Sequence, residues 1–192
     1  MRSRLGDAPN LASPGQRQAL MEFLNEWRCR ITLSNFEELE SRPQRWAAVW
    51  VRQLPAPTSD IRLLTQPQRE TVGEAYQELL RLGTRLRFSH TAAAKTLHAL
   101  RPRVLPIWDS AVKGAFSALP RPAPLLPGQL YPAFIEHVAE QLSRLEQDAR
   151  RLKLSLTEAH RKIARPQEYS LVKLADEYAW VTITLAARGE SL

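Results

Sequence analysis

Apolar residues recur every three to four positions along most of the chain, and this spacing is typical of amphipathic helices. The first predicted helix begins at Pro14, where Ser13 supplies the cap and the proline occupies the first turn. Its apolar face consists of Leu20, Phe23, Leu24 and Trp27. We find no segment that alternates apolar and polar residues well enough to predict a strand, so the chain is predicted to be all-α.

Prolines and turn residues divide the rest of the pattern into further helices. The predicted helices span about residues 43–54, 66–82, 90–100, 107–119, 131–152, 157–164 and 170–187, with short turns at 35–40 and 61–64. Gly83 is predicted to cap the helix before it, and the proline-rich segment 120–128 is predicted to be a loop. These elements predict one compact orthogonal bundle of about eight helices over residues 14–192, after a flexible N-terminus at 1–13.

The composition places the chain among ordinary globular proteins of the cytoplasm. Hydrophobic residues make up 44% of the 192 positions, which is enough for a packed core. The one cysteine, Cys29, cannot form an internal disulfide, and its helical surroundings favour a small core residue. No apolar run approaches the roughly 20 residues that span a bilayer. The basic opening is not followed by an apolar core, so we expect neither a signal peptide nor a membrane partner.

The charge pattern allows two explanations. The net charge is +7, and the window 81–103 contains six basic residues and no acid. Such a window would attract a polyanion, above all nucleic acid, if its side chains shared one surface. A basic bias of the composition explains the charge equally well. The six residues are Arg81, Arg85, Arg87, Lys95, Arg101 and Arg103.

The sequence lacks the residue patterns of several kinds of metal, catalytic and phosphate-binding site. The four histidines and Cys29 show no spacing typical of zinc ligands, so no metal site and no cofactor are predicted. A serine-hydrolase elbow and the glycine-rich loops that bind phosphates are absent as well.

One acidic residue stands alone in this basic region. Asp109 is the only acid between Glu78 and Glu136, and it follows a short connection that contains Pro102 and Pro106. It stands at the start of a predicted helix, where the backbone amides favour an ionised carboxylate. Asp109 is therefore either a helix cap or an anionic residue at the edge of a basic cleft.

Residues 83–119 resemble the core of the helix-hairpin-helix DNA glycosylase superfamily. In that family an alanine-rich helix with lysine or threonine leads through a proline-containing link to an aspartate that opens the next helix. Here PIWDS at 106–110 resembles the Pro-Val-Asp step, with one additional residue before the acid. The segment HTAAAK at 90–95 is most similar to the archaeal oxidised-guanine branch.

The resemblance implies a DNA-binding, glycosylase-like protein that excises bases by a monofunctional route. Asp109 would stabilise the cationic sugar after base flipping, and His90 would assist departure of the base. Arg87, Arg101 and Arg103 would hold phosphates. Two positions differ from the family: residues 86–90 lack the glycines of the Leu-Pro-Gly-x-Gly hairpin, and His90 or Thr91 replaces the lyase lysine.

Two other functions stand beside this one. The chain could be a non-catalytic member of the fold that only binds nucleic acid, which is expected if Asp109 lies outside any open cleft. It could also be a helical protein-interaction domain with no nucleic-acid role. That alternative is favoured if the basic residues of window 81–103 do not share one surface.

Overall fold

The fold is described from a computed structural model. It describes residues 9–29, 31, 36–82, 88–119, 123–163, 170–175 and 178. Most of the predicted flexible N-terminus, the Gly83 cap, and the predicted helix beyond residue 175 lie outside these residues, except for Tyr178.

The prediction of an all-α protein is confirmed over the part of the chain that is described, which contains no strand. A short helical turn at 171–175 follows the last labelled helix. The labelled elements are α1 (Pro14–Glu26), α2 (Phe36–Trp50), the 3-10 helix η3 (Ile61–Leu63), α3 (Gln66–Arg81), α4 (His90–Leu100), α5 (Ser110–Ala118), α6 (Pro127–Arg151) and α7 (Leu156–Ile163).

Local capping signals fix the starts of the two helices that lead to the candidate site. At α3, the Thr65 hydroxyl accepts the Gln68 amide at 3.4 Å, while the Gln68 side chain accepts the Thr65 amide at 2.9 Å. At α4, the Ser89 hydroxyl accepts the Ala92 amide at 3.2 Å. Because these bonds satisfy amides that the helix itself leaves unpaired, both starts agree with the predicted positions.

Three other predicted boundaries were wrong, in each case near a proline. A single helix, α2, runs through Pro43 and ends at Trp50, where we predicted a turn, a break and then a helix to residue 54. The helix α6 begins at Pro127 and continues through Pro132, so the predicted loop 120–128 is shorter. A proline costs a helix one hydrogen bond, and packing elsewhere along the helix offsets that loss. The helix predicted from residue 107 starts at Ser110.

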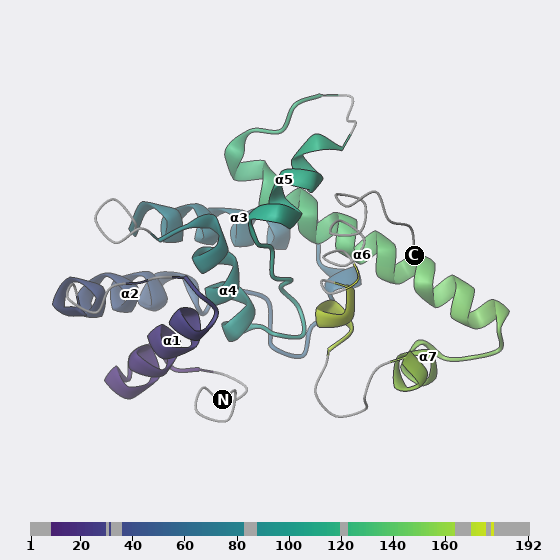
Figure 1. The fold of residues 1–192 in the computed structure, drawn as a ribbon, viewed down its shortest axis with the longest axis horizontal. Coiled ribbons are helices and arrows are strands. Elements are labelled where there is room, and N and C mark those ends of the chain that lie inside the picture. Colours follow the sequence, from purple (N-terminus) through teal and green to yellow (C-terminus); the bar gives the residue numbers. More distant parts are fainter. Residues whose placement is uncertain are drawn as a thin grey trace.

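Helix α3 lies at the centre of the fold and packs against α2, α4 and α6 (Figure 1). The long α6 extends away from this centre, and α7 packs against it. Helices α3 and α6 approach each other closely at Gly73, where a Cβ would lie only 2.5 Å from Cγ of Pro132. The absence of a side chain at Gly73 therefore lets the two helices meet.

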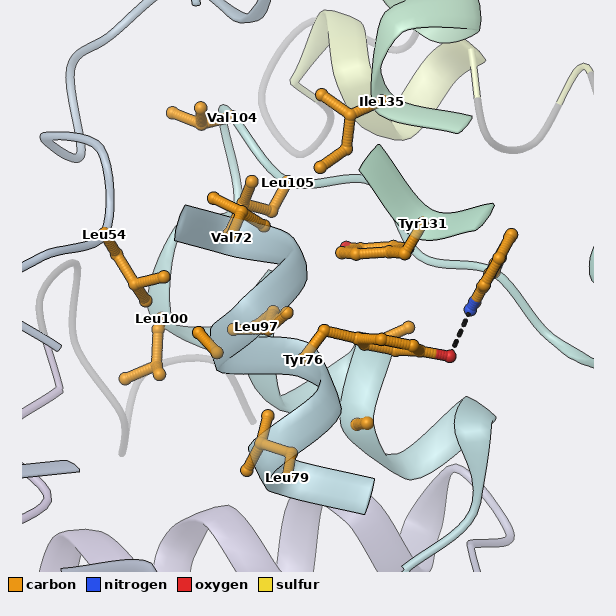
Figure 2. Packing of buried hydrophobic residues seen from close by; sticks show 14 of the residues in the cluster. Leu54, Val72, Tyr76, Leu79, Leu97, Leu100, Val104, Leu105, Tyr131 and Ile135 are labelled. Carbon is orange, nitrogen blue, oxygen red and sulfur yellow. Dashed lines mark hydrogen bonds between the residues drawn. The ribbon is translucent and has the colours of Figure 1, made fainter. Parts of the chain in front are cut away.

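The core beside the candidate site is aromatic. The ring of Tyr76 on α3 stacks on that of Tyr131 on α6, with centroids 4.6 Å apart (Figure 2). Trp108, just before α5, packs against both Tyr131 and Phe134 of α6, with a centroid distance of 5.3 Å to each. These contacts hold the entry to α5 against α3 and α6.

No helix in the described part of the chain is long and apolar enough to cross a membrane.

Candidate functional site

Asp109 is the N-cap of α5. Its backbone is extended, and its carboxylate oxygen Oδ1 accepts the Val112 amide at 2.9 Å. The side chain is half-buried, so the carboxylate reaches the molecular surface while it caps the helix. The capping role is therefore observed, and among the described residues no protein group donates a hydrogen bond to the second carboxylate oxygen.

The connection that leads to Asp109 is held by the core. Pro106, Ile107 and Trp108 are all buried, and the hydroxyl of Tyr131 donates to the Pro106 carbonyl at 2.7 Å. The chain thus enters α5 from the interior and emerges at Asp109. This explains why Trp108 stands next to an acid at a helix start: its ring anchors the connection.

Two hydrogen bonds join the start of α5 to the start of α4. The Trp108 indole Nε1–H donates to the Tyr76 hydroxyl at 3.0 Å. The same hydroxyl lies 2.8 Å from Nδ1 of His90, the first residue of α4. Because the Tyr76 oxygen already accepts from the indole, its own proton is available for the imidazole nitrogen.

The two distances at the Tyr76 hydroxyl favour one tautomer of His90, because the hydroxyl lies 2.8 Å from Nδ1 and 3.5 Å from its other acceptor, the His90 carbonyl. When Nδ1 accepts the Tyr76 proton, a neutral imidazole carries its own proton on Nε2. Burial, and to a smaller extent the positive charge of Lys113, lower the pKa of His90 below its ordinary value. His90 is therefore held as a neutral imidazole that presents an Nε2–H donor.

Lys113 is the cationic group near His90. It lies one helical turn after Asp109 and is half-buried, and burial lowers the pKa of its ammonium. Its charge acts on His90, which places the two side chains in the same neighbourhood. Within the described residues, Lys113 forms no ion pair with Asp109.

A known protein family matches the part of the chain that contains these residues. The profile of DUF6308, a family of unknown function, matches residues 31–182. The chain belongs to the DUF6308 family. No curated protein and no solved structure is significantly similar to it.

The DUF6308 match includes Tyr76, His90, Trp108, Asp109 and Lys113. Sequence reasoning found His90 and Asp109 but missed Tyr76 and Lys113. Tyr76 was indistinguishable from other apolar positions of its helix, because only its hydroxyl sets it apart. The signal for Lys113 was its position one turn after the lone acid.

Two of the predicted phosphate-binding residues lie in the interior of the DUF6308 fold. Lys95 and Arg101 are each only 7% exposed. The Lys95 ammonium donates to the Trp27 carbonyl at 2.8 Å and lies 5.0 Å from the centroid of the Trp27 ring. Neither side chain presents its charge to a surface, contrary to the shared surface that the window 81–103 suggested.

Arg101 is bound on three sides by backbone oxygens. Its Nε donates to the Pro55 carbonyl at 2.6 Å, Nη1 to that of Leu100 at 2.9 Å, and Nη2 to that of Val51 at 2.9 Å. The guanidinium thus ties the end of α4 to the segment that follows α2. Its five donors suit this task, because they satisfy several buried carbonyls at once.

Two further residues of the basic window are described and exposed. Arg81 is exposed and forms an ion pair with Glu78, and Arg103 is exposed in the connection after α4. Arg85 and Arg87 lie outside the described residues, as does most of the predicted hairpin at 86–90.

Cys29 follows α1 rather than lying within it, since that helix ends at Glu26. It packs against the core, and burial raises the pKa of its thiol, so the structure gives it the packing role that the sequence favoured. No group of three His, Cys, Asp or Glu side chains is arranged to hold a metal ion in the described part of the chain.

Proposed function

We propose that this DUF6308 protein is a nucleic-acid-binding protein of the helix-hairpin-helix glycosylase type, and that it excises a base by a monofunctional route with Asp109. The observation that carries the proposal is the position of the lone acid. Helix α4 ends, a buried proline-bounded connection crosses the core, and Asp109 emerges at the first turn of α5. The family that residues 83–119 resemble places its aspartate at the same step.

The proposed role of Asp109 is electrostatic stabilisation of the transition state. Base release leaves positive charge on the sugar, and a carboxylate fixed beside that sugar lowers the barrier. The cap bond to the Val112 amide holds one oxygen in place and leaves the other for the substrate. The target nucleotide would have to leave the duplex to reach it, because the acid lies at the start of a helix whose entry is buried.

We infer the monofunctional route from the helix start where the glycosylase family places its lyase lysine. His90 opens α4, so no lysine stands at that helix start to form a Schiff base with the sugar aldehyde. Lys95, on the same helix, is bonded to the Trp27 carbonyl in the interior. Excision should therefore leave the strand intact, and borohydride should trap no adduct that depends on Lys95.

Asp109→Asn tests the proposal. Asparagine keeps the shape and the capping ability but removes the charge. We expect the variant to fold and to bind duplex DNA like the parent, while base release falls by about a thousandfold or more. The measurement is single-turnover base release on a panel of duplexes with damaged bases. Asp148→Asn, a change at an exposed acid of α6, is the matched control and should retain the parent rate.

Equal rates for the Asp109→Asn variant and the parent would contradict the proposed mechanism. A parent that binds duplex DNA but releases no base from the panel would favour a second function, nucleic-acid binding without catalysis. The bond from Asp109 to the Val112 amide is the observation behind that second function, since a capping aspartate has a structural role without any substrate.

A further inference from the structure

We propose that His90 and Lys113 together bind one phosphate group, with the His90 Nε2–H and the Lys113 ammonium as its donors. The proposal rests on the proposed function, because it gives the candidate site its contact with the nucleic-acid backbone. It also assigns His90 to a phosphate rather than to the departing base.

Hydrogen bonds through Tyr76 place His90 close to the start of α5. The Trp108–Tyr76–His90 hydrogen bonds, at 3.0 and 2.8 Å, bring the first residue of α4 beside the first turn of α5. Asp109 follows Trp108 directly, and Lys113 lies one turn later on the same helix. The imidazole of His90 on α4 therefore lies close to the entry of α5, the helix that carries Asp109 at its cap and Lys113 one turn later.

The Nε2 nitrogen of His90 can act as a hydrogen-bond donor to an anion. Since Tyr76 donates to Nδ1, Nε2 carries a proton in the neutral ring, and it also does so in the imidazolium. His90 can thus donate to an anion at any pH near neutrality. Burial and the charge of Lys113 keep the imidazolium scarce, and a neutral imidazole is a poor acid for base departure.

The ammonium of Lys113 would be stabilised by an anion. A half-buried ammonium with a lowered pKa and no acidic partner among the described residues is costly. An anion between Lys113 and His90 would offset that cost, and would also relieve the repulsion that lowers the pKa of His90. A phosphate, with several acceptor oxygens, can accept from both groups together.

His98, on the same helix, provides an internal reference for the tautomer of His90. Nδ1 of His98, two turns after His90, lies 2.8 Å from the Leu105 carbonyl. A carbonyl can only accept, so Nδ1 of His98 carries a proton, whereas Nδ1 of His90 does not. The ring nitrogens of the two histidines should therefore give opposite patterns of ¹⁵N shifts.

The test is a titration of the full chain with inorganic phosphate, followed by ¹⁵N spectra of the histidine rings. We expect phosphate to raise the pKa of His90 and to leave that of His98 unchanged. Lys113→Ala should weaken phosphate binding about tenfold, because a charge-assisted hydrogen bond is lost. Lys162→Ala, at an exposed lysine of α7, is the matched control and should bind like the parent.

Two results would overturn the phosphate site: a His90 signal that does not respond to phosphate, or equal loss of binding in the Lys113→Ala and Lys162→Ala variants. Tyr76→Phe provides a second variant, since it removes the donor to Nδ1 and leaves the ring in the core. Provided that it folds, it should give His90 a mixture of tautomers. An unchanged tautomer would show that Tyr76 does not position the imidazole.

A duplex oligonucleotide distinguishes the source of the phosphate and separates the two proposals. Displacement of inorganic phosphate from His90 by the duplex supports a backbone phosphate. If phosphate moves the His90 signal but the duplex does not bind, the phosphate site stands for a small phosphate compound and the proposed function fails. If the duplex binds and His90 does not respond to either ligand, the phosphate site fails and the proposed function stands.

Discussion

Positive side chains occupy two different settings around helix α4. On the side facing the core, Lys95 and Arg101 are buried, and their N–H groups donate to backbone carbonyls. At the start of the helix, His90 lies beside Lys113, and that lysine has no acidic partner among the described residues. The first pair stabilises the fold, whereas we propose that the second binds a phosphate.

The difference shows how a count of charges along a sequence misleads. Lys95, Arg101 and Arg103 were counted alike as members of the window 81–103, yet of these three only Arg103 is exposed. A guanidinium in the interior can replace several missing backbone donors. The same group on a surface would meet phosphates. Only the position of the side chain distinguishes these roles.

The largest effect on stability is expected at Arg101. Arg101→Met keeps much of the apolar volume but leaves the buried carbonyl of Pro55 and the partly buried carbonyl of Val51 without their donor. We expect the free energy of unfolding to fall by about 3 kcal/mol. Urea denaturation measures this change. Arg103→Met, at the exposed arginine two residues later, should change stability by less than about 0.5 kcal/mol. Equal losses in both variants would contradict the contrast between the two settings.

A smaller effect on stability is expected at the cap of α5. Asp109→Ala removes the acceptor of the Val112 amide and should cost about 1 kcal/mol, whereas Asp109→Asn should cost only a few tenths. Ser89→Ala, which removes the cap of α4, is the comparison and should also cost about 1 kcal/mol. Thermal unfolding measures all three. A large loss in the asparagine variant would show that the charge itself holds α5.

The smallest effect is expected in the salt dependence of DNA binding. Each phosphate contact that is lost should reduce the log–log salt slope by about 0.9 on duplex DNA. Lys113→Ala should therefore reduce the slope by one contact. Lys95→Met should leave the slope unchanged, because that charge is already bonded in the interior. A lower slope in the Lys95→Met variant would place Lys95 at the interface instead.

Sequence reasoning located part of the candidate site, because part of it is local. The start of α4 follows from Ser89, and the helix start near Asp109 follows from the proline-bounded connection before it. Tyr76 and Trp108 were beyond such reasoning. They lie 14 residues before and 18 residues after His90, and only the packing of α3 against α4 and the entry to α5 brings their hydrogen-bonding atoms together.

Local patterns along the chain were sufficient to predict a helical protein and the starts of α3 and α4, since 3.6-residue periodicity and capping bonds act between residues three or four positions apart. Tertiary structure decided whether a proline ends a helix, as Pro43 and Pro132 show, and which cations are exposed. Both outcomes depend on what a distant segment places next to the residue. The carbonyls of Val51 and Pro55, about 50 residues before Arg101, turn an apparent phosphate-binding arginine into part of the core.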